Sequence, residues 1–165
     1  MLTKEDFLAS IEHETKILKH VFSKADPAKA DDRPAEGIRS TLELMQYLTF
    51  CGSVPVQAFL EGNWSAAAQA SEEASSMKFE EFPARLDAQV EKIRGMLAEI
   101  PAEEFMTREV PMPWGVDVKL GAGLVDSSLK FLAAYRLQFF NRVKLSGATE
   151  MSTMNAWLGM DKPPA

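Results

Sequence analysis

Residues 124–145 read LVDSSLKFLAAYRLQFFNRVKL, and their pattern is the main evidence for the fold class. Residues three or four positions apart share one face of a helix. The face that this spacing defines here carries Ser128, Phe131, Leu132, Tyr135, Phe139 and Arg142. We therefore predict a long helix that starts near Leu124, continues to about Leu145 and stops at Ser146-Gly147. A helix of this length needs partner helices to cover its apolar face.

Three segments before it supply such partners. The first is a helix over about 6–24, preceded by Thr3-Lys4-Glu5-Asp6, which resembles a capping box, and stopped by Asp26-Pro27. The second begins at the capping box Ser40-Thr41-Leu42-Glu43 and carries Leu44, Leu48 and Cys51 on one face. Gly52 and Pro55 interrupt it, and we expect further helix around 56–60. The third covers about 83–99 and ends at Pro101.

The connections are short or irregular. Residues 25–39 form a polar connection, 61–64 a turn, and 65–78 give no firm prediction. The breakers and valines of residues 107–119 predict an extended excursion with a small hairpin around Trp114-Gly115. Gly121-Ala122-Gly123 is interpreted as an entry turn to the last long helix. Ser152 caps a short helix through Trp157, and residues 161–165 form a tail.

These elements predict an all-α protein. Four long amphipathic helices joined by short connections are typical of an up-and-down four-helix bundle. The prediction adds a short extra C-terminal helix and an irregular loop before the last long helix. With 165 residues, the chain has room for a single domain over residues 1–165.

Composition narrows the class of protein. The chain has 18 Lys and Arg against 24 Asp and Glu, a formal net charge of −6, which argues against nucleic acid as a partner. The single cysteine, Cys51, indicates a reducing compartment. The N-terminus lacks the apolar run of a signal peptide, and no apolar stretch is long enough to cross a bilayer. We expect a soluble cytoplasmic protein that does not associate with membranes.

The residues offer little for metal or nucleophilic catalysis. The two histidines, His13 and His20, are seven positions apart on one helix, about 10 Å along its axis, which is too far for both to bind one ion. We interpret them as surface or interface residues and Cys51 as a buried small hydrophobe. Trp64 and Trp157 are assigned to packing, whereas Trp114, in the Pro-rich loop, fits packing and ligand contact equally well.

Several motifs resemble the DinB-like (YfiT-like) family. They are Arg39-Ser40-Thr41-Leu42-Glu43-Leu44 with Tyr47, the loop Pro113-Trp114-Gly115, Phe131 to Gln138 followed by Gly147, and the ending Met154 to Asp161. The resemblance covers most of the chain and implies an up-and-down four-helix bundle. It also implies a metal site with one histidine from the second helix and two from the last. Some relatives are thiol-cofactor enzymes, the mycothiol-dependent maleylpyruvate isomerase and the bacillithiol transferase.

This sequence departs from the family pattern at the ligands. Tyr47 matches the second-helix histidine, and Phe131 and Tyr135 match the last-helix pair, while Arg136 and Gln138 keep the family residues and Leu137 replaces a glycine. Phenylalanine cannot bind a metal, and a tyrosine of ordinary pKa near 10 is a poor ligand. We therefore expect a relative without metal or other cofactor, in which the site has become an aromatic pocket or is simply filled by packed rings.

Two functions remain open on this interpretation. The first, which we favour, is a non-catalytic protein that binds a small molecule or a partner through Tyr47, Phe131, Tyr135, His20, Arg136 and Trp114, with no catalytic residue. The alternative is a metal-independent or thiol-cofactor-related transferase or isomerase that uses tyrosine and histidine as acid and base. The family resemblance also suggests a symmetric homodimer.

Overall fold

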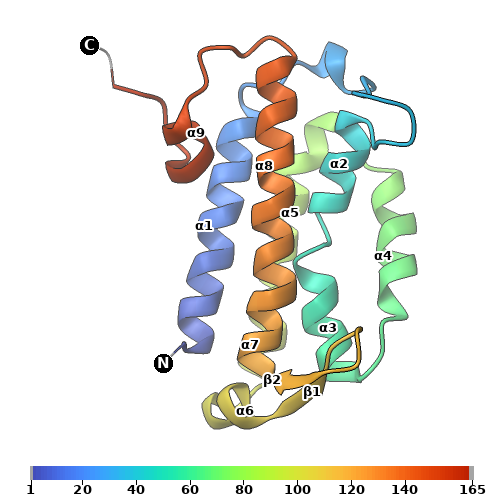
Figure 1. Ribbon diagram of the computed structural model, residues 1–165, viewed down its shortest axis with the longest axis vertical. Coiled ribbons are helices and arrows are strands. Elements are labelled where there is room, and N and C mark those ends of the chain that lie inside the picture. Colours follow the sequence, from blue (N-terminus) through green and yellow to red (C-terminus); the bar gives the residue numbers. More distant parts are fainter. Residues whose placement is uncertain (1, 164–165) are drawn as a thin grey trace.

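A computed structural model describes residues 2–163 of the chain. Four helical columns form the bundle, and in chain order they run up, down, down and up (Figure 1). They are α1 (Lys4–Phe22), the pair α2 (Thr41–Leu48) and α3 (Ser53–Glu61), α5 (Phe82–Ala98), and the continuous run of α7 (Leu120–Leu124), the π-helical η3 (Val125–Leu129) and α8 (Lys130–Leu145). α1 packs on α5 and α8, α2 on α8, and α3 on α5. The predicted all-α four-helix bundle is confirmed, with α4 (Ala66–Ser75) returning the chain between the second and third columns.

Side-chain caps fix where three helices begin. The Thr3 hydroxyl accepts from the Asp6 amide at 3.1 Å, and the Asp6 carboxylate accepts from the Thr3 amide at 3.0 Å. The same reciprocal pair joins Ser40 and Glu43 at the start of α2. Ser152 and Asn155 open α9 (Thr153–Leu158) in this way too. These caps satisfy backbone groups that the first turn of a helix leaves unpaired, so the capping predictions hold.

The break between α2 and α3 is held by a buried amide. The Gln89 side chain of α5 accepts from the Gly52 amide at 2.9 Å and from the Ser53 amide at 3.2 Å, and it donates to the Leu48 carbonyl at 3.0 Å. A Cβ at Gly52 would lie 2.9 Å from Leu132 Cδ1. The predicted interruption is therefore a packed and hydrogen-bonded feature of the bundle interior.

The last column begins earlier than the sequence predicted. Strands β1 (Glu109–Pro111) and β2 (Asp117–Lys119) form the expected hairpin, with Val110 opposite Val118. Helix α7 then starts at Leu120, so the entry turn assigned to Gly121-Ala122-Gly123 is wrong. A Cβ at Gly121 would lie 2.7 Å from Phe105 Cε1. These glycines let α6 (Ala102–Thr107) and the hairpin approach the helix, which is a packing reason that spacing alone does not reveal.

The remaining elements cover the outside of the bundle. Helix α4 (Ala66–Ser75), in the stretch without a firm prediction, lies against α2 and α3, and α9 packs on α1 and α8 (Figure 1). Short 3₁₀ turns, η1 (Pro27–Lys29) and η2 (Phe79–Glu81), sit in two connections. Pro164 and Ala165 of the predicted tail lie outside the described residues. Within residues 2–163, no helix combines the length and apolarity needed to span a bilayer.

Candidate functional site

Tyr47 of α2 and Tyr135 of α8 meet where these two helices pack. Their ring centroids are 4.6 Å apart and the ring planes are inclined by 61°, an edge-to-face contact. The Phe50 ring adds a second edge contact on Tyr47 at 5.2 Å. Edge-to-face geometry places the positive ring edge of one partner on the negative face of the other. The two tyrosines of the chain therefore form one aromatic pair.

Arg39 covers this pair. Its guanidinium carbon lies 4.4 Å from the centroid of Tyr47 and 5.8 Å from that of Tyr135, within the range of a cation–π interaction. The Arg39 carbonyl accepts a hydrogen bond from Arg142 Nη2 at 2.9 Å. Arg39 precedes the Ser40 cap of α2, so the capped helix start places its backbone beside the rings. We use "Arg39–tyrosine site" for Arg39, Tyr47 and Tyr135.

The Tyr47 phenol stays protonated near neutral pH. Burial raises the pKa of Tyr47 far above its ordinary value of 10.0, and the neighbouring Cys51 thiol and Tyr135 add to the increase. Burial also raises the pKa of the Cys51 thiol, which is a free, buried cysteine as the sequence suggested. The site therefore offers a phenol O–H as a hydrogen-bonding group, but neither a phenolate nor a thiolate.

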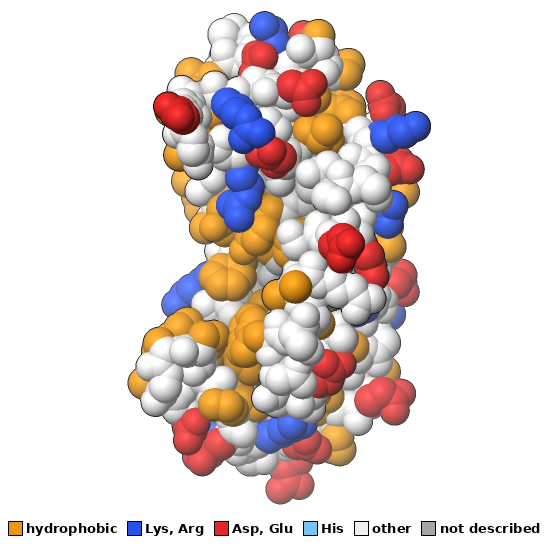
Figure 2. All heavy atoms as spheres, turned by 90° about the vertical axis from the view of Figure 1, so that its right-hand side faces the viewer, with side chains coloured by type: hydrophobic (Ala, Val, Ile, Leu, Met, Phe, Trp, Pro, Cys, Tyr) orange, Lys and Arg blue, Asp and Glu red, His pale blue; other side chains and the backbone are white. Residues whose placement is uncertain are grey.

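A surface pocket of about 300 Å³ opens beside Tyr47. It lies between α2 and α4 and is lined by Arg39, Glu43, Gln46, Tyr47, Phe50, Ser71 and Ser75. The Gln46 amide donates to the Ser75 carbonyl at 3.0 Å, which fixes one wall. Figure 2 shows that the side of the molecule carrying α4 is hollowed at mid-height, with apolar side chains gathered in the hollow. The structure thus has an open pocket next to a packed aromatic pair.

Phe131 lies one turn before Tyr135 on α8. It is half-buried and packs against the apolar core. It does not line the pocket beside Tyr47. Phe131 therefore packs against the interior of the bundle and is not part of the pocket wall.

Arg136 points away from the tyrosines. It is 2% exposed, its Nε donates to Glu14 of α1, and its Nη1 donates to the Ala156 carbonyl of α9. Its guanidinium carbon lies 4.9 Å from the centroid of the Trp157 ring. These contacts hold α8, α1 and α9 together, and the structure gives Arg136 a packing role in place of the predicted ligand contact.

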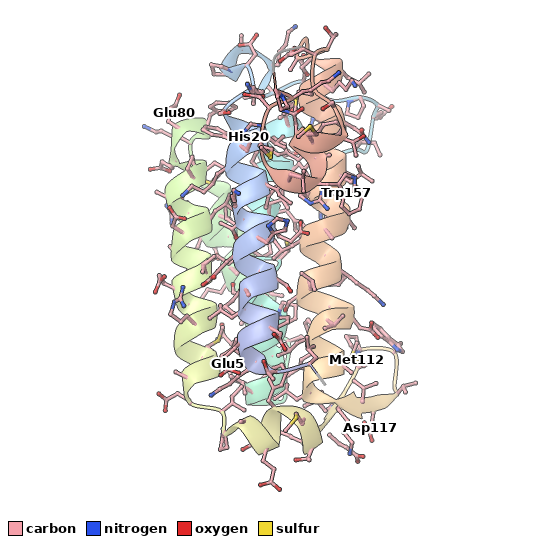
Figure 3. All side chains as sticks on the ribbon, turned by 90° about the vertical axis from the view of Figure 1, so that its left-hand side faces the viewer. Glu5, His20, Glu80, Met112, Asp117 and Trp157 are labelled. Atoms are coloured by element: carbon pink, nitrogen blue, oxygen red, sulfur yellow. The ribbon has the colours of Figure 1, made fainter. Side chains whose placement is uncertain are left out.

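His20 also belongs to the α9 side. Its Nε2 lies 3.0 Å from Asn155 Nδ2 and 3.6 Å from an oxygen of Asp161. His13, on the same helix, contacts the Trp157 carbonyl at 3.1 Å. Figure 3 shows His20 and Trp157 together at the α9 end. The structure therefore does not bring His20 to the tyrosine pair, and both histidines are interface residues as the simpler interpretation expected.

Trp114 sits in the hairpin turn and is 62% exposed. Met112 and Asp117, which flank that turn, lie at the opposite end of the molecule from His20 (Figure 3). Trp64 makes an edge contact with Phe59 at 5.7 Å and Trp157 stacks on Arg136, so both serve packing. Of the predicted ligand residues, the structure joins only Tyr47 and Tyr135 in direct contact.

The residues at this site do not fit a metal ion. The phenol of Tyr47 resists ionisation, the Arg39 guanidinium lies over both rings, and Phe131 has no ligand atom. A cation placed there would face the Arg39 guanidinium, and the carboxylate of the adjoining pocket, Glu43, already accepts hydrogen bonds from Arg33 and from the Ser40 amide. Across residues 2–163, no group of three His, Cys, Asp or Glu side chains is close enough together to hold an ion.

Sequence reasoning missed Arg39, Phe50 and the contribution of α4. Arg39 was visible as the residue before the Ser40 cap, and Phe50 lies three positions after Tyr47, which is the spacing of neighbours on one helix face. The serine- and alanine-rich stretch 65–78 carried no apolar pattern that would have predicted a pocket wall. Its role depends on packing against α2 and α3, which is a tertiary effect.

Comparison with known proteins supports the fold. No family model and no curated protein matches the sequence. Among solved structures, the crystal structure of a DinB-like protein from Bacillus subtilis is similar, with a TM-score of 0.66 and 18% sequence identity over 88% of this chain and 95% of that chain. At this identity the likeness extends to the fold. The chain therefore has the DinB-like helical-bundle fold, with its aromatic pair between α2 and α8.

Proposed function

We propose that this DinB-like bundle is a non-catalytic binding protein that holds a small aromatic carboxylate at the Arg39–tyrosine site without a metal ion. The observation that carries the proposal is the Arg39 guanidinium, 4.4 Å from the Tyr47 centroid at the wall of a pocket of about 300 Å³. Pockets for small ligands combine apolar walls with few charged groups, and this volume is at their lower end.

The charges of the pocket favour an anion. Its one carboxylate, Glu43, is already engaged by Arg33, whose Nη1 donates to Glu43 Oε2 at 2.7 Å. Glu43 also accepts from the Ser40 amide at 2.8 Å. Arg39 instead lies over the tyrosine rings and keeps N–H donors for a ligand. Tyr47 and Phe50 offer ring surfaces on which a flat ligand can pack.

Calorimetric titration with benzoate tests this proposal. We expect saturable binding, and a dissociation constant at least tenfold higher for Arg39→Gln and for the neutral analogue benzamide, because each removes one partner of the charge-assisted bond. Arg85→Gln is the matched control, since Arg85 is an exposed arginine on α5 that lines another pocket. Equal binding by the wild type and Arg39→Gln, or no saturable benzoate binding, would overturn the proposal.

The alternative function, an enzyme using tyrosine and histidine as acid and base, requires those groups at one site. His20 has its partners on the α9 side, Asn155 and Asp161, whereas Tyr47 has its partners on α2 and α8. This division of partners supports the binding protein over the transferase or isomerase.

The homodimer stays a prediction. Trp157 and Leu158 of α9 and Leu137 of α8 are 57%, 46% and 45% exposed, and α9 packs on α8. We propose that two copies pair through these side chains, since clustered apolar exposure marks protein interfaces. Sedimentation equilibrium should give twice the mass of 18.3 kDa, and Leu137→Glu with Trp157→Glu should return it to the monomer. A monomeric wild type would contradict this proposal.

A further inference from the structure

A second pocket, of about 400 Å³, lies where the loop after α1 meets the end of α8. Three cations and one carboxylate line it: Lys29, Arg33 and Arg142 against Asp32, with Pro34, Thr41, Leu145, Ser146 and Gly147 completing the wall. The chain as a whole has a formal net charge of −6. A local excess of positive charge in an acidic protein marks a place where an anion is attracted.

Two of the three cations have partners within the fold. Arg33 forms a two-pronged ion pair with Glu43 and also donates to the Ile38 carbonyl at 2.9 Å. Lys29 lies 3.5 Å from Asp32, a long ion pair at an exposed position. Arg33 is therefore already hydrogen-bonded within the protein, and its side chain forms part of the pocket wall.

Arg142 is the third cation of this pocket, and no carboxylate among the described residues forms an ion pair with it. Its Nη2 donates to the Arg39 carbonyl, but its Nη1 is buried and has no hydrogen-bond partner among the described residues. A buried donor without a partner has lost its hydration and gained no hydrogen bond in return, and the cost is greater when the donor is charged. Burial also lowers the pKa of Arg142, so the charged form gains when an anion approaches.

We propose that this pocket binds the phosphate group of a small molecule, with Arg142 and Lys29 as the residues that hold it. Arginine matches the geometry of phosphate oxygens and forms strong charge-assisted bonds with them. The pocket is larger than a free phosphate ion needs, and Pro34 and Leu145 offer apolar surface for an attached carbon group. The site is separate from the pocket beside Tyr47 and depends on different side chains.

Calorimetric titration at fixed ionic strength tests the site with two probes, inorganic phosphate and glycerol 2-phosphate. We expect saturable binding of one equivalent, and a dissociation constant at least tenfold higher for Arg142→Gln and for Lys29→Gln. Tighter binding of glycerol 2-phosphate identifies a phosphorylated small molecule as the source of the group, and tighter binding of inorganic phosphate identifies the free ion.

A control variant and the exposed position of Lys29 keep the test decisive. Arg85→Gln removes the same charge from an exposed position on α5 and should bind both probes as the wild type does. Lys29 is exposed and lies outside the long helices, so Lys29→Gln should fold normally even if Arg142→Gln does not. Absence of saturable binding to both probes, or an equal loss in Lys29→Gln and Arg85→Gln, would overturn the proposal.

Discussion

Tyr47 and Tyr135 contact each other edge to face across the α2–α8 interface, with centroids 4.6 Å apart. The resemblance noted in the sequence assigned both positions to metal ligands on different helices. The structure brings these two side chains into contact as aromatic rings, with Arg39 above them. The chemistry at this point of the fold is therefore that of ring packing, a protonated phenol and a guanidinium.

Replacing one ring of the pair should weaken the bundle. Tyr135→Leu should lower the free energy of unfolding by about 1 kcal/mol, because it removes the edge-to-face contact while keeping an apolar side chain. Tyr135→Phe keeps the ring and should stay within about 0.5 kcal/mol of the wild type. Urea denaturation measures both. Equal losses in the two variants would mean that the hydroxyl, and not the ring contact, stabilises the pair.

The buried Arg136–Glu14 pair should be strongly coupled. Arg136→Met should cost about 3 kcal/mol because it leaves the Glu14 carboxylate buried without its partner, and adding Glu14→Leu should recover part of that loss. Arg94→Met is the matched control, since Arg94 of α5 pairs on the surface with Glu12 of α1, the helix that also carries Glu14, at 2.7 Å. Its loss should stay below about 1 kcal/mol. A double-mutant cycle measured by urea denaturation checks this, and strictly additive losses would contradict it.

A glycine at a packed helix position and a glycine at an open one should respond to alanine in opposite ways. Gly121→Ala places a Cβ 2.7 Å from Phe105 and should cost about 1–3 kcal/mol by overpacking. Gly95→Ala, in open space on α5, should add about 0.5–1 kcal/mol because alanine is the better helix former. Thermal and urea unfolding measure both changes. A stabilising Gly121→Ala would show that α7 is not packed against α6 as described.

The cap of α2 should make stability depend on acid pH. The hydrogen bond from Arg33, with help from the Ser40 amide, holds the pKa of Glu43 below its usual 4.5. A lowered folded-state pKa contributes stability above the unfolded value and loses it as the pH falls through the folded value. Glu43→Gln should therefore be less stable than the wild type at about pH 7, and the gap should close as the pH falls below the usual 4.5 and through the lowered folded-state pKa.

Urea midpoints at a series of pH values measure this gap. Glu36→Gln, at an exposed position of the preceding loop, is the control and should show no such pH-dependent difference. A gap between the wild type and Glu43→Gln that stays constant down to acid pH would rule out ionised Glu43 as the source of the stabilisation.

Much of the fold could be predicted because its signals are local. The Thr3, Ser40 and Ser152 caps and the apolar stripe of residues 124–145 depend on neighbours in the chain, and the structure confirms them. The entry turn predicted at Gly121 was wrong because a glycine in a helix and a glycine in a turn cannot be told apart from the sequence. The tertiary contact with Phe105 explains the glycine in the helix.

The site was harder to predict than the fold. The contact of Tyr47 with Tyr135 followed from the matched motif positions, but the rotation of α1 and α8 about their axes decides where His20 and Arg136 point. In the structure both residues face α9 and contact Asn155, Ala156 and Trp157. Arg39 was missed because it lies outside the helix pattern, and a cation above a ring depends on tertiary packing.

We propose that the Arg39–tyrosine site binds an aromatic anion and no metal ion. Because the chain has just two tyrosines, Tyr47 and Tyr135, incorporating 3-fluorotyrosine gives fluorine NMR signals from this site alone. We predict that benzoate shifts these signals to saturation and that one equivalent of Ni²⁺ leaves them sharp. Broadening of both signals by stoichiometric Ni²⁺, with no response to benzoate, would contradict the account.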